Sequence, residues 1–168
     1  EELGYNFRMT EIAAALGLAQ MPKIDARNEA RRRHAARLTE LLSPAAAASP
    51  VTPAFSQPPV ARAFSPRIVL PQQLPGRTHV WHQYTIRVAA GRAARDALQM
   101  SLRERGIESA IFYPAPIHRQ PLYQRLGYGD LDFPIAQRLA DEVLSLPVHP
   151  ALSGSDIETI ARAVRESL

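Results

Sequence analysis

Two polar side chains close to the start of the chain have the chemistry of an anion site. Asn6 and Arg8 alternate with Tyr5 and Phe7 in the stretch GYNFRM. An extended backbone sends alternate side chains to opposite faces, so the amide and the guanidinium point the same way. Both groups donate hydrogen bonds, and a helix predicted to start just after them adds free N–H groups, which favours a phosphate or carboxylate ligand. A turn made by Asn6 and a surface ion pair made by Arg8 explain the spacing equally well.

A second candidate site is the segment YPAPIHRQ at 113–120. Pro114 and Pro116 restrict themselves and the residues before them to extended conformations. A loop stiffened in this way is suited to hold Tyr113, His118 and Gln120 against a ligand. From these residues alone, a rigid structural loop with a solvent-facing histidine is the favoured interpretation, and a binding loop is the alternative.

Several chemistries are excluded by residue type or spacing. The chain has no cysteine, which rules out disulfides, thiolate metal sites and a cysteine nucleophile. No phosphate-binding glycine loop, HExxH zinc motif or GxSxG motif is present. None of the five histidines pairs with another at a helical metal-ligand spacing, and His79 and His82 are predicted on opposite faces of a strand. We therefore expect no metal site.

Length and charge limit the class of protein. With 168 residues, 46% of them hydrophobic, the chain is long enough for one domain, or for a small domain and part of a second. No apolar run approaches a membrane span and no leader pattern is visible, so we expect a cytoplasmic protein without membrane contact. The net charge of +4 is modest for a nucleic-acid binder.

The main basic cluster lies at 31–33, in a helical pattern where Glu29 is placed for an i,i+4 pair with Arg33. A solvated helix face is the favoured interpretation, and we expect no nucleic-acid partner. A non-catalytic basic binding module built on this cluster is the alternative from another functional class.

Two helices are predicted near the start of the chain. Thr10 is a suitable N-cap for a helix that carries Ile12 and Leu16 at helical spacing. Pro22 fits the first turn of a second helix, which runs from about residue 23 to 42 with sparse apolar positions. We expect this helix to lie across a surface or an interface. A proline-rich segment at 44–75 follows, predicted as loop and edge structure.

The rest of the chain predicts a small α+β layer with helices on one face of a short sheet. The segment HVWHQYTIRVA at 79–89 alternates as a strand, with His82 and Tyr84 on the apolar face as a hydrogen-bonded core pair. A helix with Leu98 and Leu102 in its stripe follows, and Gly106 ends it. The segment IESAIFY at 107–113 is the next predicted strand.

The last third of the chain completes this layer. A long loop at 113–130 with a helical turn near Leu122 is followed by a helix through Val143 and a short strand at 146–148. Ser155 and Glu158 form a predicted capping box at the start of a terminal helix with an apolar stripe.

The motifs GYNFRMTEIAAALGLAQ, VWHQYTIRV, RGIESAIFYPAPIHRQPLYQRLGY and EVLSLPVHPALSGSDI occur in this order. The chain thereby resembles the C-terminal part of the DegT/DnrJ/EryC1/StrS family of pyridoxal-phosphate-dependent sugar aminotransferases, over nearly all its length except 44–77. Within the family it looks most like enzymes that aminate UDP-linked 3-keto-hexuronic acids.

The resemblance implies an α/β fold, the C-terminal part of a fold-type I PLP-transferase. Residues 1–43 would be the end of the large PLP domain with interface helices, 44–77 a connector, and 78–168 a small α+β domain with a mainly antiparallel sheet. The family's Schiff-base lysine would belong upstream, because Lys23 does not match its motif. The chain would then contain no catalytic residue and be inactive alone.

The resemblance also implies roles for individual residues. Asn6, with Arg8 beside it, would bind the cofactor phosphate of the other subunit of a homodimer. Tyr113 and His118, with Gln120 as the third member of the candidate loop, would border the nucleotide-linked keto-sugar. Phe112 departs from the His or Tyr found in many relatives, which puts its own substrate contacts in doubt.

The implied reaction is transamination with glutamate as amino donor, in amino-sugar or surface-polysaccharide biosynthesis. A dehydratase-like relative, in which a histidine replaces the lysine, is the alternative within the family.

Overall fold

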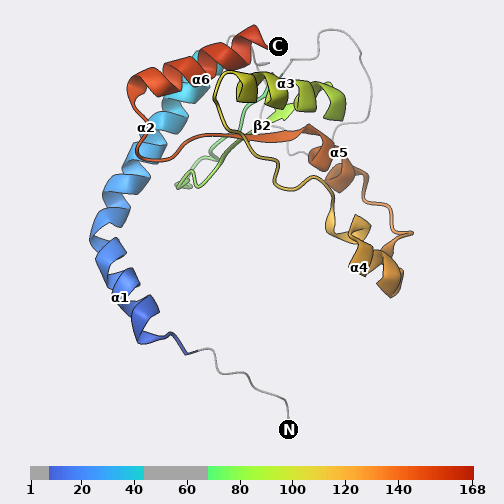
Figure 1. Cartoon of the computed structure of the whole chain (residues 1–168), viewed down its shortest axis with the longest axis horizontal. Helices are drawn as coiled ribbons and strands as arrows, with labels where there is room; N and C mark the ends of the chain where they lie inside the picture. The colour runs from blue at the N-terminus through green and yellow to red at the C-terminus, as the bar shows by residue number, and fades with distance from the viewer. Residues whose placement is uncertain (1–7, 44–67) are drawn as a thin grey trace.

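The computed structural model describes residues 8–43 and 68–168 of the chain. These residues form an arch in which a long helical arm descends on one side and a shorter arm around α4 on the other (Figure 1). Asn6 and most of the predicted connector lie outside the described residues. None of the described helices is long and apolar enough to cross a membrane.

The long arm consists of α1 (Glu11–Gln20), a 3-10 turn η1 (Met21–Lys23) and α2 (Ile24–Leu42). Thr10 caps α1 as predicted, because its hydroxyl accepts a hydrogen bond of 3.2 Å from the backbone N–H of Ala13. The proline at 22 lies in η1, so the second predicted helix begins where expected. α1 buries no side chain, whereas α2 buries Leu38 and Leu42 in its second half. The arm is therefore anchored in the core by the second half of α2, the part nearest the body, and α1 is not.

The sheet is three-stranded and antiparallel, in the order β1 (Ile68–Val69), β2 (Tyr84–Val88) and β3 (Val143–Leu146). Along β2 the buried positions alternate, as the sequence pattern predicted for the second half of this segment. β1 is an edge strand, in register with the end of β2. The antiparallel sheet confirms the predicted architecture.

The strand predicted at 79–89 is shorter than expected. Trp81 has a positive φ of 51°, and its backbone N–H donates to Nδ1 of His79 at 2.8 Å. This turn breaks the extended backbone before β2 starts. His82 is consequently exposed, and the predicted core pair of His82 and Tyr84 is wrong. Tyr84 is buried instead against α2, with its hydroxyl 2.7 Å from that of Thr39.

Two other strand predictions also need correction. The segment at 107–113 makes a single isolated bridge, between Ala110 and Ser145, and is not a strand. α5 (Pro134–Glu142) ends one residue before Val143, which already pairs with β2, so the strand occupies 143–146 and not 146–148. Pro147 follows at once and has no N–H to extend the ladder.

The end of α3 (Arg92–Glu104) confirms the predicted stop at Gly106. Gly106 has a φ of 74°, and its N–H donates to the carbonyl of Arg103 at 3.0 Å. The N–H of Ile107 donates to the carbonyl of Leu102 at 2.9 Å. Both bonds together form a Schellman motif, which favours glycine at its left-handed position.

The terminal helix α6 (Gly154–Glu166) carries a capping box at a different pair of residues than predicted. The Ser153 hydroxyl accepts from the N–H of Asp156 at 3.2 Å, and the Asp156 carboxylate accepts from the N–H of Ser153 at 2.8 Å. Glu158 instead accepts a hydrogen bond of 2.8 Å from Arg37, which ties α6 to α2. The predicted box of Ser155 and Glu158 is therefore wrong: the observed box lies two residues earlier in the chain.

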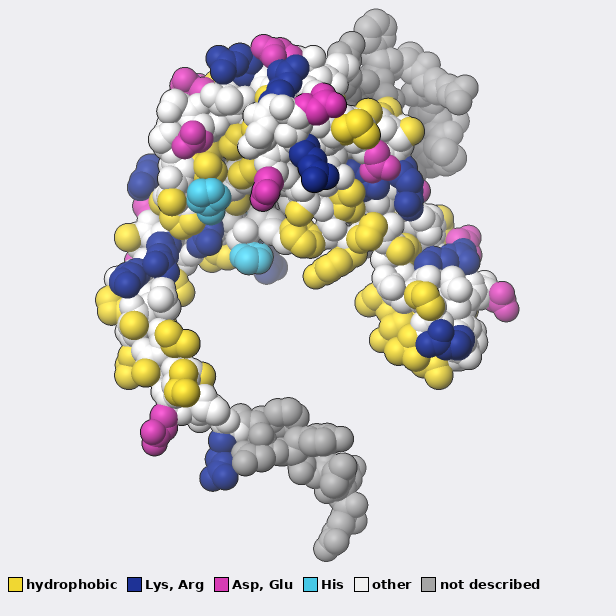
Figure 2. All heavy atoms as spheres, in the orientation of Figure 1, with side chains coloured by type: hydrophobic (Ala, Val, Ile, Leu, Met, Phe, Trp, Pro, Cys, Tyr) yellow, Lys and Arg dark blue, Asp and Glu magenta, His cyan; other side chains and the backbone are white. Residues whose placement is uncertain are grey.

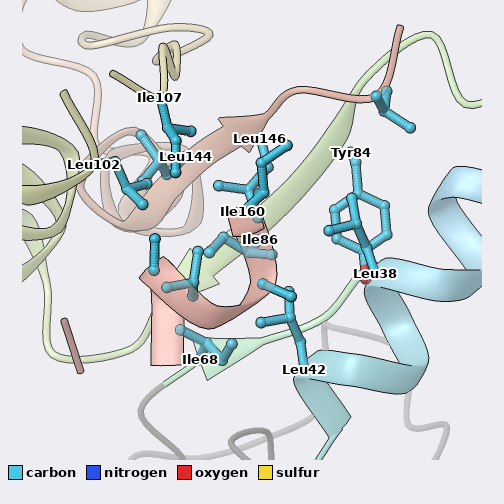
Figure 3. Close-up of a cluster of buried hydrophobic side chains, with 14 of the residues drawn as sticks. Leu38, Leu42, Ile68, Tyr84, Ile86, Leu102, Ile107, Leu144, Leu146 and Ile160 are labelled. Atoms are coloured by element: carbon cyan, nitrogen blue, oxygen red, sulfur yellow. The ribbon is translucent and has the colours of Figure 1, made fainter. Parts of the chain in front are cut away.

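The core lies where α2, α3 and α6 meet the sheet. Tyr84 and Ile86 of β2 point into the same cluster as Leu38 and Leu42 of α2 and Ile160 of α6 (Figure 3). Because the cluster takes side chains from both ends of the described chain, it closes only once these segments meet. The buried apolar members are Ala35, Leu38, Leu42, Ile68, Trp81, Tyr84, Ile86, Val88, Leu98, Leu102, Ile107, Leu144, Leu146, Val148, Ile157, Ile160, Ala161, Ala163 and Val164.

Candidate substrate site and its surroundings

The predicted loop forms one wall of a cavity of about 830 Å³, here called the aromatic cavity. The loop continues through η3 (Ile117–Arg119), α4 (Pro121–Tyr123) and η4 (Gln124–Tyr128), which make the short arm of the arch. In Figure 2, hydrophobic side chains gather on the side of this arm that faces the inside of the arch, and charged side chains lie on its other sides. α5 supplies the opposite wall. The lining residues share aromatic or aliphatic character and are Phe112, Tyr113, Ala115, Pro116, Ile117, His118, Tyr123, Tyr128, Leu131, Phe133, Ala136, Leu139, Ala140 and Val143.

Two of the three predicted loop residues meet at this cavity. His118 is only 8% exposed and packs edge-on against Phe133, with ring centroids 4.9 Å apart. A solvent-facing histidine, the favoured interpretation from sequence, is therefore wrong. Tyr113 is 71% exposed and lies at the rim. Gln120 does not line the cavity; its backbone carbonyl accepts from the N–H of Gln124 at 3.0 Å.

Hydrogen bonds from neighbouring arginines hold the loop in this shape. Arg92 donates to the carbonyl of Pro114 at 3.3 Å and to the carboxylate of Asp141 at 2.7 Å. Arg119 donates to the carbonyl of Gly129 at 2.9 Å. The loop is thus fastened to α3, to α5 and to its own far end, so the cavity walls are held by contacts on both sides.

A second cavity of about 670 Å³, here called the Arg31 cavity, opens on the other side of Phe112. Phe112 is half-exposed and lines both cavities, so this departure from the family pattern lies at their junction. The sequence analysis missed this second cavity, because its walls come from four separate segments. Its residues are Arg31, His82, Gln83, Arg105, Gly106, Ile107, Glu108, Ser109, Ala110, Phe112, Ser145, Leu146, Pro147, Val148, His149, Leu152, Asp156, Thr159 and Ile160.

The basic cluster at 31–33 divides between two environments. Glu29 lies 3.1 Å from Arg32 and 3.9 Å from Arg33, which confirms the predicted i,i+4 pair on a solvated face. Arg31 instead points into the Arg31 cavity. The three consecutive arginines therefore do not form a single surface: Arg32 and Arg33 pair with Glu29, and Arg31 lines the cavity.

The candidate cofactor residues fall at the tip of the long arm. Arg8 is exposed just before α1 and lines neither cavity, while Asn6 lies outside the described residues. Their convergence on a phosphate therefore stays a prediction. Lys23 is exposed in η1 and also lines neither cavity.

A Schiff-base lysine needs a pocket that lowers its pKa, so Lys23 does not fit that role. Within residues 8–43 and 68–168, no group of three or more His, Asp or Glu side chains could hold a metal ion.

Comparison with known proteins places these features in a family. The sequence matches the DegT/DnrJ/EryC1/StrS aminotransferase family over residues 1–165. It is 37% identical to a pleiotropic regulatory protein of Geobacillus stearothermophilus, over 98% of this chain and 38% of the relative. It is 35% identical to the UDP-N-acetyl-3-dehydro-alpha-D-glucosamine 3-aminotransferase of Acidithiobacillus ferrooxidans, over 99% of this chain and 38% of the relative.

The fold agrees with the sequence match. The solved structure of S. venezuelae DesV superposes with a TM-score of 0.77 at 30% identity, over 99% of this chain and 38% of DesV. The chain thus spans about 38% of the length of the relatives it matches. It belongs to the DegT/DnrJ/EryC1/StrS aminotransferase family, whose members depend on pyridoxal phosphate.

Proposed function

We propose that this chain is the C-terminal part of an aminotransferase that transfers an amino group from glutamate to a nucleotide-linked keto-sugar. Family membership supports the reaction class. Residues 1–43 would then end the large domain and supply interface helices, and residues 78–168 would form the small domain. Pyridoxal phosphate, when bound, supplies the electron sink for the exchange of amino and keto groups.

The observation that carries this proposal is the aromatic cavity. Its volume of about 830 Å³ lies in the range of small-ligand sites, which typically combine apolar walls with a few polar groups. Tyr113 offers an exposed ring and hydroxyl at the rim, and His118 offers a buried imidazole in the wall. Flat aromatic faces stack on nucleobases, and sugar hydroxyls need hydrogen-bond partners. These two side chains would therefore orient the nucleotide-linked sugar.

The role proposed for the arm residues is to hold the cofactor. A guanidinium presents paired N–H donors that match a phosphate, which suits Arg8, and the amide of Asn6 adds a further donor. The arm projects away from the body (Figure 1), so we propose that it reaches the active site of a second subunit in a homodimer. Exposed apolar residues along α1, among them Ile12 and Leu16, support burial of this arm against another chain.

For the substrate, we propose a UDP-linked 3-keto sugar in the biosynthesis of a surface polysaccharide. The relative from Acidithiobacillus ferrooxidans, named for a UDP-linked 3-dehydro sugar, supports this choice. More specifically, we propose that the sugar is a hexuronic acid, the class indicated by the QYTIRV and YPAPIHRQP motifs.

The test uses the longer protein that contains this chain, supplied with pyridoxal phosphate, glutamate and a UDP-linked 3-keto sugar. We expect formation of 2-oxoglutarate, measured with glutamate dehydrogenase, and of one amino sugar per keto acid, measured by mass spectrometry. Loss of water from the sugar without 2-oxoglutarate would refute transamination and favour the dehydratase-like relative.

The binding site is tested with Tyr113→Ala, and Leu126→Ala, an exposed residue of the short arm that does not line the cavity, is the control. Loss of the rim tyrosine should raise KM for the nucleotide sugar by about tenfold, since base stacking contributes ~1–3 kcal/mol. The half-reaction with glutamate, followed by cofactor absorbance, should be unchanged. An equal effect on both half-reactions would contradict a substrate-specific role.

A further inference from the structure

The Arg31 cavity is lined by residues with polar atoms that no described residue satisfies. The Nε atom of Arg31 and the Oγ atom of Ser109 are both buried, and neither has a hydrogen-bond partner among the described residues. Both residues line the same cavity, although they are far apart in sequence. Buried polar atoms without a partner destabilise a protein. Two further such atoms, Nε of Arg32 and Nδ1 of His34, belong to residues that line neither cavity, so Arg31 and Ser109 are distinguished by lining one cavity together.

The unmatched charge belongs to Arg31 and not to its neighbours. Arg32 and Arg33 share Glu29, at 3.1 and 3.9 Å. No ion pair or hydrogen bond joins the Arg31 side chain to any residue of the described segments. A guanidinium keeps its charge at any ordinary pH and offers donors in a planar fork, the geometry that matches a carboxylate or phosphate.

The acidic residues around the cavity do not fill this need. Asp156 accepts from the hydroxyl of Ser153 at 2.7 Å and from its N–H at 2.8 Å, so its carboxylate is committed to the helix cap. Glu108 is exposed and forms no ion pair with Arg31. Arg105 lies 2.5 Å from Glu166, which already neutralises that second arginine.

The other lining residues indicate what the rest of a ligand would contact. His82 and His149 are exposed at the rim, where they add N–H donors, while Val148 and Leu152 supply apolar surface. The volume of about 670 Å³ admits a small organic molecule and exceeds the needs of one or two waters.

We propose that the Arg31 cavity binds the carboxylate or phosphate group of a small organic anion. The Arg31 guanidinium donates to the anionic oxygens, the Ser109 hydroxyl donates to the same group, and the apolar walls take the organic body. This site adjoins the aromatic cavity at Phe112, and it does not depend on the proposed transamination.

The test is calorimetric titration of the protein with benzoate and with phenyl phosphate, two probes that share a ring and differ in the anionic group. Benzyl alcohol is the uncharged control. We expect at least one anion to bind about tenfold or more tightly than the alcohol, because a charge-assisted bidentate pair is then formed. Tighter binding of benzoate assigns a carboxylate ligand, and tighter binding of phenyl phosphate assigns a phosphate ligand.

Matched variants locate the binding. Arg31→Gln should weaken the tighter probe by about tenfold or more, and Ser109→Ala by roughly threefold. Arg33→Gln removes the same charge from the same helix, at a side chain that is 66% exposed and outside the cavity, and should change binding less than about twofold.

Circular dichroism establishes that each variant is folded, and the small Ser109→Ala change keeps the test valid if Arg31→Gln unfolds. Anion binding no tighter than that of the alcohol, or equal losses in Arg31→Gln and Arg33→Gln, would overturn the site.

Discussion

Arg95 is the most buried charged side chain of the described residues, and replacing it by Met tests how α3 and α5 are held together. The residue is 1% exposed. One terminal nitrogen donates to the carbonyls of Ala140 and Val143, both at 3.1 Å, where α5 ends and β3 begins. These carbonyls belong to a helix C-terminus, which lacks partners within the helix and favours a cation. Met fills similar space without any donor.

The expected loss of unfolding free energy follows from these contacts. One buried and one part-buried carbonyl lose a charged donor, at ~1–3 kcal/mol each for an unsatisfied group, partly offset because the guanidinium no longer has to be desolvated. The ion pair with Asp96 adds little, since the Asp96 side chain is 51% exposed. We expect Arg95→Met to cost about 2–4 kcal/mol, which shifts the urea midpoint by about 1–2 M.

The matched control is Arg92→Gln, on the same helix and also bonded to α5. Arg92 lies 2.7 Å from Asp141, but its side chain is half-exposed, so its loss should cost less than about 1 kcal/mol. Urea unfolding followed by circular dichroism measures both variants. If Arg95→Met is no less stable than Arg92→Gln, the inference that Arg95 caps α5 is refuted.

Three further predictions concern pH and backbone. Burial raises the pKa of Tyr84 to about 12, above its ordinary 10.0. The contribution of the protonated hydroxyl to the free energy of unfolding is therefore full below pH 10 and is lost as the pH rises towards 12. The stability of wild type relative to Tyr84→Phe should fall by about 2–3 kcal/mol across that window in urea titrations; a constant difference would contradict it. The pKa of Asp156 is lowered by hydrogen bonds from the side chain and then the backbone of Ser153. The advantage of wild type over Asp156→Asn should therefore be present above pH 3.8 and vanish as the pH falls through the folded-state pKa; persistence in acid would argue against the cap. Gly106→Ala should cost about 1 kcal/mol, because its φ of 74° disfavours a Cβ that otherwise meets open space. Gly154→Ala, equally open but without a positive φ, should not destabilise, and equal thermal shifts in both would refute the reasoning.

Features with local causes were predicted correctly from the sequence. Thr10 caps its helix and Gly106 ends another, because each uses hydrogen bonds to residues within a few positions along the chain. The capping box shows the limit of such reasoning. Two serines flank Gly154 at the start of α6. Ser153 is the cap because the carboxylate of Asp156 reaches its backbone, while Glu158 pairs with Arg37 on a distant helix.

The candidate site was predicted in part. Tyr113 and His118 line one cavity, but the burial of His118 depends on Phe133, which comes from beyond the short arm. Gln120 shares the loop without sharing the cavity. Arg31 and Ser109 had no recognisable pattern, because an arginine in a basic run and a serine after a glycine turn are ordinary surface residues by type.

The sequence by itself determined the family and the helices, because motif order and the 3.6-residue period are properties of the chain read along its length. Tertiary structure decided where β3 lies, that Arg95 is buried, and that Arg31 and Ser109 share a cavity. Each of these depends on which distant segment supplies the partner: the ladder of β2 sets the first residue of β3, and the end of α5 gives Arg95 its acceptors. Contacts of this kind exist only after the segments pack, so no local pattern encodes them.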